Sequence, residues 1–438
     1  MPTGAVLPAF ERMLIMSKKL KPYVCGALIV LIALIISCIV YLTVNAISFA
    51  VYSGRCKEAG LIPRLDVTTE GGAEILSKED YVGCTVTLGG SDITEASAGI
   101  RGRGNTTWEF FPKKPYRIKF DEKTSLFGES KNKSWVLLAL YNDFSLSKDR
   151  LAFTLADAIG TEGFVPSYNY VELYLNGDYK GLYLLTDQVD ENKGRTEVKD
   201  DDFLESGAAE VPFLVELDAY APDEGVEDVD WFSVGGRAYT VKYPEADERY
   251  SDAQMQYIKE YIEKVEICAN AHDLDALCEL VDIESFIDYY IISEVMGQPE
   301  INWKSVYMHK AVGERMKMGP LWDFDWAAMG PEMDSYKGDT RGLRSVGNWF
   351  ELMLSGSPEF CDMVNERFTE IEPKLKSAIQ NADGELEALV PYFKKNHLKW
   401  HWYRPFTNPE RRFNELTEWL GERIQWLGDY FGEISSEK

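Results

Sequence analysis

Two carboxylates within one short apolar stretch are the residues best suited to chemistry. Residues 318–326 read Met-Gly-Pro-Leu-Trp-Asp-Phe-Asp-Trp, so Asp323 and Asp325 alternate with aromatic rings. In a strand, residues two apart point to the same face, which would place both carboxylates at the mouth of a cleft. Magnesium takes oxygen ligands, usually one or two carboxylates together with substrate phosphates. The pattern therefore predicts a divalent-cation site, and its alternative is a strand end with solvated acids.

A third acid, Glu300, stands in the loop 297–304, just before a strand predicted at 306–309. A turn at Gly313 then leads toward Trp322 and Asp323, so Glu300 and Asp323 flank one hairpin and are expected to lie near each other. Paired acids could also hydrolyse glycosides. That chemistry would leave the basic residues described next without a role.

The densest cationic region of the chain lies at 101–119, where two runs read Arg-Gly-Arg-Gly-Asn and Lys-Lys-Pro-Tyr-Arg. Glycines at 102 and 104 let backbone amides approach an anion, and arginine or lysine side chains can meet phosphate oxygens. The alternative is a polar turn before a half-solvated strand. The predicted phosphate- or nucleotide-binding residues are Arg103, Asn105, Lys114 and Arg117.

The composition makes this basic region conspicuous. The chain has 438 residues, a net charge of -26, 45% hydrophobic residues and 13% aromatic residues. Such a chain folds around a sizeable core. Its charge argues against nucleic acid and against broad attraction to anionic lipid headgroups. Any phosphate site must therefore be built from local cations.

The N-terminal region is predicted to cross a membrane. From Pro22 to Gly54 the chain carries no charge, and the apolar core from Tyr23 to Val44 exceeds the ~20 residues that span a bilayer. Basic residues precede this stretch, which keeps the N-terminus in the cytoplasm and sends the rest outside. We predict a cytoplasmic tail at 1–21, a signal anchor at 22–53 and a linker at 54–61. Cleavage near Ala46 or Ala50 is the alternative.

Seven cysteines do not amount to a disulfide scaffold in so long a chain. Cys25 and Cys38 lie in the predicted span, which leaves five outside and at most two internal disulfides. The pairs nearest in sequence are Cys56 with Cys84 and Cys268 with Cys278, and the pairing stays open.

Other catalytic chemistries have little support. The chain has four histidines and no Gly-x-Ser-x-Gly run. His397 and His401 stand at helical spacing, but the glutamate of a zinc-protease motif is missing, and Trp400 and Trp402 favour packing.

Alternating and helical patterns predict an α+β fold, β-rich to about residue 250 and helix-rich after it. Asn176-Gly177 between two alternating segments predicts a hairpin. The predicted strands are 62–67, 81–88, 116–120, 135–141, 170–175, 179–185, 213–218 and 238–243. The predicted helices are 143–159, 251–269, 274–280, 283–296 and a C-terminal set from 349 to 431, broken at Gly384, Pro391 and 405–409.

Six runs of residues in one order resemble the CotH spore-coat kinase family. They lie at 103–108, 113–117, 135–138, 174–177, 181–185 and 322–325, and the resemblance covers roughly 62–420. It implies that residues 62–432 form an atypical protein-kinase-like core with a mixed or antiparallel sheet. It also implies phosphate transfer from ATP to serine or threonine of an envelope or spore-coat-type protein, with Mg²⁺ or Mn²⁺.

The resemblance also implies roles for single residues. Asp323 corresponds to the metal-binding aspartate, and Glu300 to the catalytic position, where the family usually carries aspartate. Lys148-Asp149 replaces a common Arg-Asn pair. The expected protein is thus a membrane-anchored, extracytoplasmic kinase, and its alternative is a catalytically impaired surface binding or assembly protein.

Overall fold

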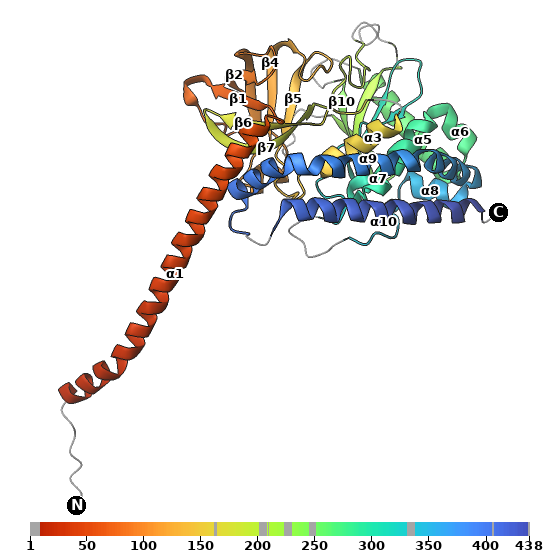
Figure 1. Cartoon of the computed structure of the whole chain (residues 1–438). Coiled ribbons are helices and arrows are strands. Elements are labelled where there is room, and N and C mark those ends of the chain that lie inside the picture. The colour runs from red at the N-terminus through yellow and green to blue at the C-terminus, as the bar shows by residue number, and fades with distance from the viewer. Residues whose placement is uncertain are drawn as a thin grey trace, which may run out of the picture.

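The computed structural model describes residues 9–161, 164–200, 208, 210–222, 230–244, 251–330, 338–404 and 407–436. A long N-terminal helix, α1, rises into a barrel, and a second sheet lies beside that barrel (Figure 1). Helices α9 and α10 run side by side along the domain (Figure 1). The α+β class is confirmed.

Helix α1 spans Ala9–Ala59 as one continuous element. Its part from Gly26 to Ala59 contains an 18-residue window with a mean hydropathy of 3.0 and is long enough to cross a membrane. This apolar helix is compatible with a signal anchor and with a signal peptide. It extends into the segment predicted as a linker, because its last turn is held by the domain: the Tyr392 hydroxyl donates to the Cys56 carbonyl at 3.0 Å and accepts from Leu61 N at 2.9 Å.

Seven strands of the described chain close into a barrel in the order β1-β2-β3-β4-β5-β7-β6. The closing pair, β1 with β6, is parallel, and the other neighbours are antiparallel. Alternate side chains fill the barrel, as the period of a strand requires. The strands are β1 Arg64–Thr69, β2 Val82–Leu88, β3 Ala96–Gly102, β4 Tyr116–Thr124, β5 Asn132–Leu138, β6 Asn169–Leu175 and β7 Asp178–Asp187.

The hairpin between β6 and β7 confirms the Asn-Gly signal. Asn176 and Gly177 have φ of 52° and 82°, which is the left-handed pair that a tight hairpin turn needs. Strand β3 was missed, because its Ala-Ser-Ala-Gly sequence has low strand propensity. Gly102 therefore ends a strand, and its missing side chain makes room for Trp108, whose ring would lie 2.5 Å from an added Cβ.

The second sheet has the order β12-β11-β8-β10-β9, and all its described pairs are antiparallel. A strand predicted around Trp322 is not formed. Strand β12 ends at Met318, since Pro320 has no N–H for a ladder and Asp323 has a left-handed φ of 65°. The strands are β8 Phe213–Asp218, β9 Trp231–Val234, β10 Arg237–Tyr243, β11 Lys304–Lys310 and β12 Lys317–Met318.

Two helices differ from their predicted bounds. Helix α3 begins at Lys148 instead of Asp143, because the Asp143 carboxylate accepts from Ser145 N and Lys148 N, each at 2.9 Å, and so holds a turn before the helix. Helix α9 runs unbroken through Gly384 and Pro391, since it packs on α1, α3 and α10 along its length.

Helices α5, α6, α7, α8 and α10 follow the predicted periodicity, whereas the short α2 was not predicted. The bounds of the described helices after α1 are α2 Thr106–Phe110, α3 Lys148–Ile159, α5 Asp252–Ala271, α6 Leu274–Leu280, α7 Ile283–Val295, α8 Trp349–Gly356, α9 Pro358–Trp400 and α10 Pro409–Ser436, with 3-10 turns η1 Glu70–Gly72 and η2 Pro299–Asn302.

The six cysteines from Cys38 to Cys361 form no disulfide with one another. Cys56 packs in the large core under the helices, whereas Cys84 packs inside the barrel, so these two thiols belong to different clusters. Cys268 lies on α5 and Cys278 on α6, and both remain thiols. Neither of the two nearest pairings in sequence is formed.

Candidate active site

A cleft of about 470 Å³ lies where the barrel meets the second sheet. One wall comes from the loop after β3 and from β4, and the other comes from η2, β11 and the segment after β12. Glu300, Asp323 and Asp325 line the second wall, so the structure brings the three predicted acids to one cavity.

Glu300 lies in η2 with only 1% of its side chain exposed. Its Oε1 lies 2.6 Å from Lys304 Nζ, and its Oε2 has no hydrogen-bond partner among the described residues. Burial and the nearby Asp323 charge raise the pKa of Glu300 to about 8, against the opposing effect of Lys304. A buried carboxyl with one oxygen available suits proton transfer near neutral pH.

Asp323 is held at the cleft by its neighbours on β11. Ser305 Oγ donates to Asp323 Oδ2 at 3.0 Å, and Lys304 Nζ lies 3.6 Å from the same oxygen. Gln298 Nε2 donates to the Asp323 carbonyl at 2.7 Å, which ties the Glu300 turn to this segment. Asp323 and Ser305 both have left-handed φ, of 65° and 57°, which costs about 1–3 kcal/mol each and often marks functional sites.

Asp149, in the first turn of α3, joins this wall and was not predicted as a site residue. Its Oδ1 accepts from Phe324 N at 2.8 Å, and its side chain is buried. Burial raises the pKa of Asp149 to about 7, and the Asp323 charge adds to this rise. Burial also raises the pKa of Asp325 well above its usual range, helped by Asp323 and Asp149. The one sequence signal for Asp149 was that Lys148-Asp149 replaces the family's common Arg-Asn pair. The segment that Asp149 contacts, at Phe324, is far away in the chain.

Positive charge balances the acidic wall only in part: Lys304 contacts the carboxylates of Glu300 and Asp323, but among the described residues Asp149 and Asp325 have no ion-pair partner. Lys148 Nζ donates to the backbone carbonyls of Asp325 at 3.2 Å and Gly330 at 2.8 Å. Among the described residues, no three acidic, imidazole or thiol side chains converge closely enough to enclose a metal ion. Magnesium usually keeps waters and phosphate oxygens beside one or two carboxylates, so Asp323 and Asp325 fit it as partial ligands. Asn142 Oδ1, which is buried without a described partner, also lines the cleft.

The opposite wall is cationic, and Arg103, Asn105 and Arg117 line it. The Arg103 guanidinium lies 5.6 Å from the centre of the Trp322 ring. Arg117 donates from Nη2 to Ser134 Oγ at 3.1 Å. Lys78 and Arg101 add positive charge to this wall, whereas Lys242 and Lys304 line the cleft from the second sheet, and none of these four was predicted as a site residue.

Lys114 is not brought to the cleft. Its ammonium donates to the Trp108 carbonyl and lies 5.5 Å from the centre of the Trp108 ring. Asn105 reaches the cleft, where its Oδ1 accepts from Lys78 Nζ at 3.0 Å. The predicted set of four therefore divides into three residues at the cleft and one outside it.

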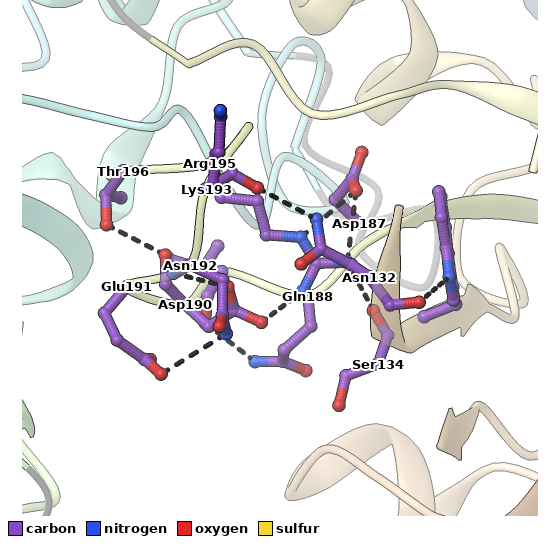
Figure 2. Close-up of polar contacts among 12 residues, drawn as sticks. Asn132, Ser134, Asp187, Gln188, Asp190, Glu191, Asn192, Lys193, Arg195 and Thr196 are labelled. Atoms are coloured by element: carbon purple, nitrogen blue, oxygen red, sulfur yellow. Dashed lines mark hydrogen bonds and ion pairs between the residues drawn. The ribbon is translucent and has the colours of Figure 1, made fainter. Parts of the chain in front are cut away.

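A buried arginine fixes the segment that follows β7 beside the cleft. Figure 2 shows Arg195 between Asp187 and Asp190, whose carboxylates it contacts, and its guanidinium also donates to the Ser134 carbonyl on β5. The Arg195 side chain is fully buried. This network anchors the chain on either side of Gln188, which lines the cleft.

Comparison with known families assigns this region of the chain. The family model described as CotH kinase protein matches residues 100–427, which is most of the chain. The chain belongs to the CotH kinase protein family. The match begins within β3, so the CotH region contains both walls of the cleft and the whole second sheet. A comparison with curated proteins found no match. The family indicates a kinase, and a kinase implies ATP.

Proposed function

We propose that this CotH protein transfers phosphate from ATP to a hydroxyl of a protein acceptor. The observation that carries the proposal is the arrangement of charge in the cleft, where Glu300, Asp323 and Asp325 on one wall face Arg103 and Arg117 on the other across a cavity of about 470 Å³. A metal-bound nucleotide complements both walls, because its metal meets the carboxylates and its phosphates meet the cations.

Each wall has a role in this proposal. Asp323 and Asp325 would hold Mg²⁺ or Mn²⁺, which neutralises phosphate charge in this reaction class. Arg103 and Arg117 bind the phosphates. Glu300 orients the acceptor hydroxyl and takes its proton at Oε2, while the new O–P bond forms and ADP leaves. Positioning and electrostatics carry this chemistry, which matches a site built from fixed charges.

The setting of the reaction is part of the same proposal. Helix α1 is apolar, and basic residues precede its apolar part, so it anchors the chain with the CotH domain outside the cytoplasm. The acceptor is a serine or threonine of an envelope or coat-type protein.

A second function is favoured by one observation. Glu300 replaces the family's usual aspartate and is held at 2.6 Å by Lys304, so its longer side chain meets a cation instead of open space. A catalytically impaired protein of this kind would bind and assemble a surface partner without phosphate transfer.

The two functions are separated by comparing Glu300→Gln with Asp323→Asn in the detergent-solubilised full chain. Glu300→Gln should lower turnover and leave nucleotide affinity unchanged, whereas Asp323→Asn should lower both. Glu79→Gln is the control, because Glu79 stands at the rim of the same cleft with 82% of its side chain exposed. A wild-type chain that neither binds nor consumes ATP with either metal would disprove the kinase proposal.

A further inference from the structure

The upper part of α1 packs against the CotH domain along one helical stripe. From Gly26 to Val40 every residue is exposed, and Tyr41 is the first to be partly covered. The covered positions then recur at intervals that keep them on one face of the helix. They are Tyr41, Asn45, Ser48, Phe49, Tyr52, Ser53 and Cys56.

Contacts at both ends of this stripe fix the helix to the domain. At the lower end the Tyr41 hydroxyl donates to the Trp402 carbonyl, and the two rings lie 6.4 Å apart. At the upper end Tyr392 on α9 binds the Cys56 carbonyl and Ile62 N. Figure 1 shows α1 meeting the domain beside the end of α9 that leads to Trp402. The domain is therefore not on a flexible tether.

The length of the uncharged part of α1 determines where the outer boundary of a bilayer falls along this helix. Pro22 to Val40 is the uncharged part before the stripe, and at ~1.5 Å per residue it is about 28 Å long, close to the ~30 Å of a hydrocarbon core. The whole uncharged stretch to Gly54 would be about 50 Å long, too much for one bilayer. Tyr41 thus falls at the outer boundary of the hydrocarbon, and a moderate tilt moves this boundary by about one turn.

Two exposed aromatic side chains lie at that level. Trp402 and Tyr403 follow the end of α9 and are 43% and 49% exposed. Tryptophan and tyrosine gather at membrane interfaces because one end of each ring system is apolar and the other is polar. We propose that Trp402 and Tyr403 insert into the lipid headgroup layer beside α1 and seat the CotH domain on the membrane. This inference rests on the anchoring part of the proposed function.

Tyr403, one of the two residues proposed to enter the headgroup layer, contacts the wall of the cleft. The hydroxyls of Tyr403 and Tyr141 lie 3.0 Å apart, and Tyr141 lines the cleft. Phe111, which also lines it, lies 5.1 Å from the Tyr141 ring, measured between ring centres. One side chain therefore separates the lipid-facing loop from the catalytic cavity. The acceptor that fits this arrangement is a polypeptide held at the same membrane surface.

The test is hydroxyl-radical labelling of the full chain in phosphatidylcholine nanodiscs, read residue by residue by mass spectrometry. Trp231 and Tyr220 are matched controls in the second sheet region, being 44% and 41% exposed. From exposure in the protein alone, Trp402 should oxidise like Trp231 and Tyr403 like Tyr220. We expect Trp402 and Tyr403 to oxidise at least threefold more slowly than their controls.

Equal oxidation rates within each pair would overturn the membrane seat while leaving the anchor intact. Intact mass of the same sample shows whether residues up to Ala46 or Ala50 have been removed, and a cleaved chain also overturns the seat. A chain that fails to enter nanodiscs contradicts the anchor itself. Phosphate transfer is not part of the readout, so loss of the kinase proposal alone would leave this result unchanged.

Discussion

The Lys304 ammonium lies between two acids of the cleft, 2.6 Å from Glu300 Oε1 and 3.6 Å from Asp323 Oδ2. Burial alone would lower the pKa of Lys304, but the Asp323 and Glu300 charges outweigh it and raise that pKa. The side chain therefore stays charged, and it also packs near the Trp303 and Trp326 rings. Lys304 links the proposed base to the proposed metal ligand.

Replacing Lys304 should impair turnover through this link. Lys304→Met leaves Glu300 buried without its cation and removes a positive charge from the cavity, so kcat should fall on the order of 10²-fold. Lys180→Met is the control, because Lys180 pairs only loosely with Asp178, at 3.8 Å, on the β6–β7 hairpin. Steady-state ATP turnover measures the effect. Unchanged kcat in Lys304→Met would remove Lys304 from the site.

Substitutions of Arg103 and Lys114, which come from the two runs of the basic region, should affect the KM for ATP differently. Arg103→Met removes a cation that lines the cleft, so the KM for ATP should rise about tenfold. Lys114→Met removes a cation that donates to the Trp108 carbonyl outside the cleft, and its KM should match that of the wild type. Titration of ATP in turnover assays distinguishes the two. A larger defect in Lys114→Met than in Arg103→Met would contradict the position of the phosphates.

The buried His309 should make the fold sensitive to acid. Burial lowers the pKa of His309 to about 4, below the ordinary value of 6.5. The unfolded chain therefore binds a proton at a higher pH than the folded one, and stability is lost as the pH falls from about 6.5 to 4. Between pH 7 and pH 5 the cost is about 2 kcal/mol.

The comparison with His309→Gln isolates this effect, since His401, whose pKa burial lowers to about 3, is present in both proteins. Urea unfolding of the detergent-solubilised chains measures the free energy of unfolding of each protein. Between pH 7 and pH 5 the value for the wild type should fall by about 2 kcal/mol relative to that for His309→Gln. An unchanged difference across this range would show that His309 is not buried in its neutral form.

A buried ion pair holds α10 to α7 and supports the second wall. Arg423 and Glu294 are both fully buried, with Arg423 Nη2 2.8 Å from Glu294 Oε2. Removing one partner leaves a buried charge, so Arg423→Leu should lower the free energy of unfolding by about 3–5 kcal/mol. Arg411→Leu is the control on the same helix, because Arg411 is 60% exposed, and it should change stability by less than about 0.5 kcal/mol. Thermal unfolding of both variants measures the contrast.

Local signals in the sequence predicted those parts of the fold that short segments determine. The hairpin at Asn176 needed only two residues with positive φ, and the strand predicted at 116–120 lies within β4, where its alternating apolar residues are buried. The three acids at 300, 323 and 325 were also predicted to meet, because they flank one hairpin. The family resemblance is confirmed by the match over 100–427.

The remaining parts of the site depend on contacts between distant segments. Asp149 reaches the acids only because α3 packs against the segment that contains Phe324. Asp323 itself has a left-handed φ after the end of β12, and the two-residue period of a strand does not predict that conformation. Lys114 and Arg117 belong to one basic run, yet the rotation of the chain before β4 turns Lys114 to Trp108. No local sequence pattern distinguishes Lys114, which lies outside the cleft, from Arg117, which lines it.

The central claim is phosphate transfer, and the direct measurement uses ATP labelled at its terminal phosphate. The full chain is incubated in phosphatidylcholine nanodiscs with Mg²⁺ or Mn²⁺, together with membrane and coat proteins carrying accessible serine or threonine. We predict label on serine or threonine with the wild type, at least 10²-fold less with Glu300→Gln, and none with Asp323→Asn. Equal labelling by wild type and Asp323→Asn, or no labelling by a chain that binds a partner without nucleotide, would contradict the account.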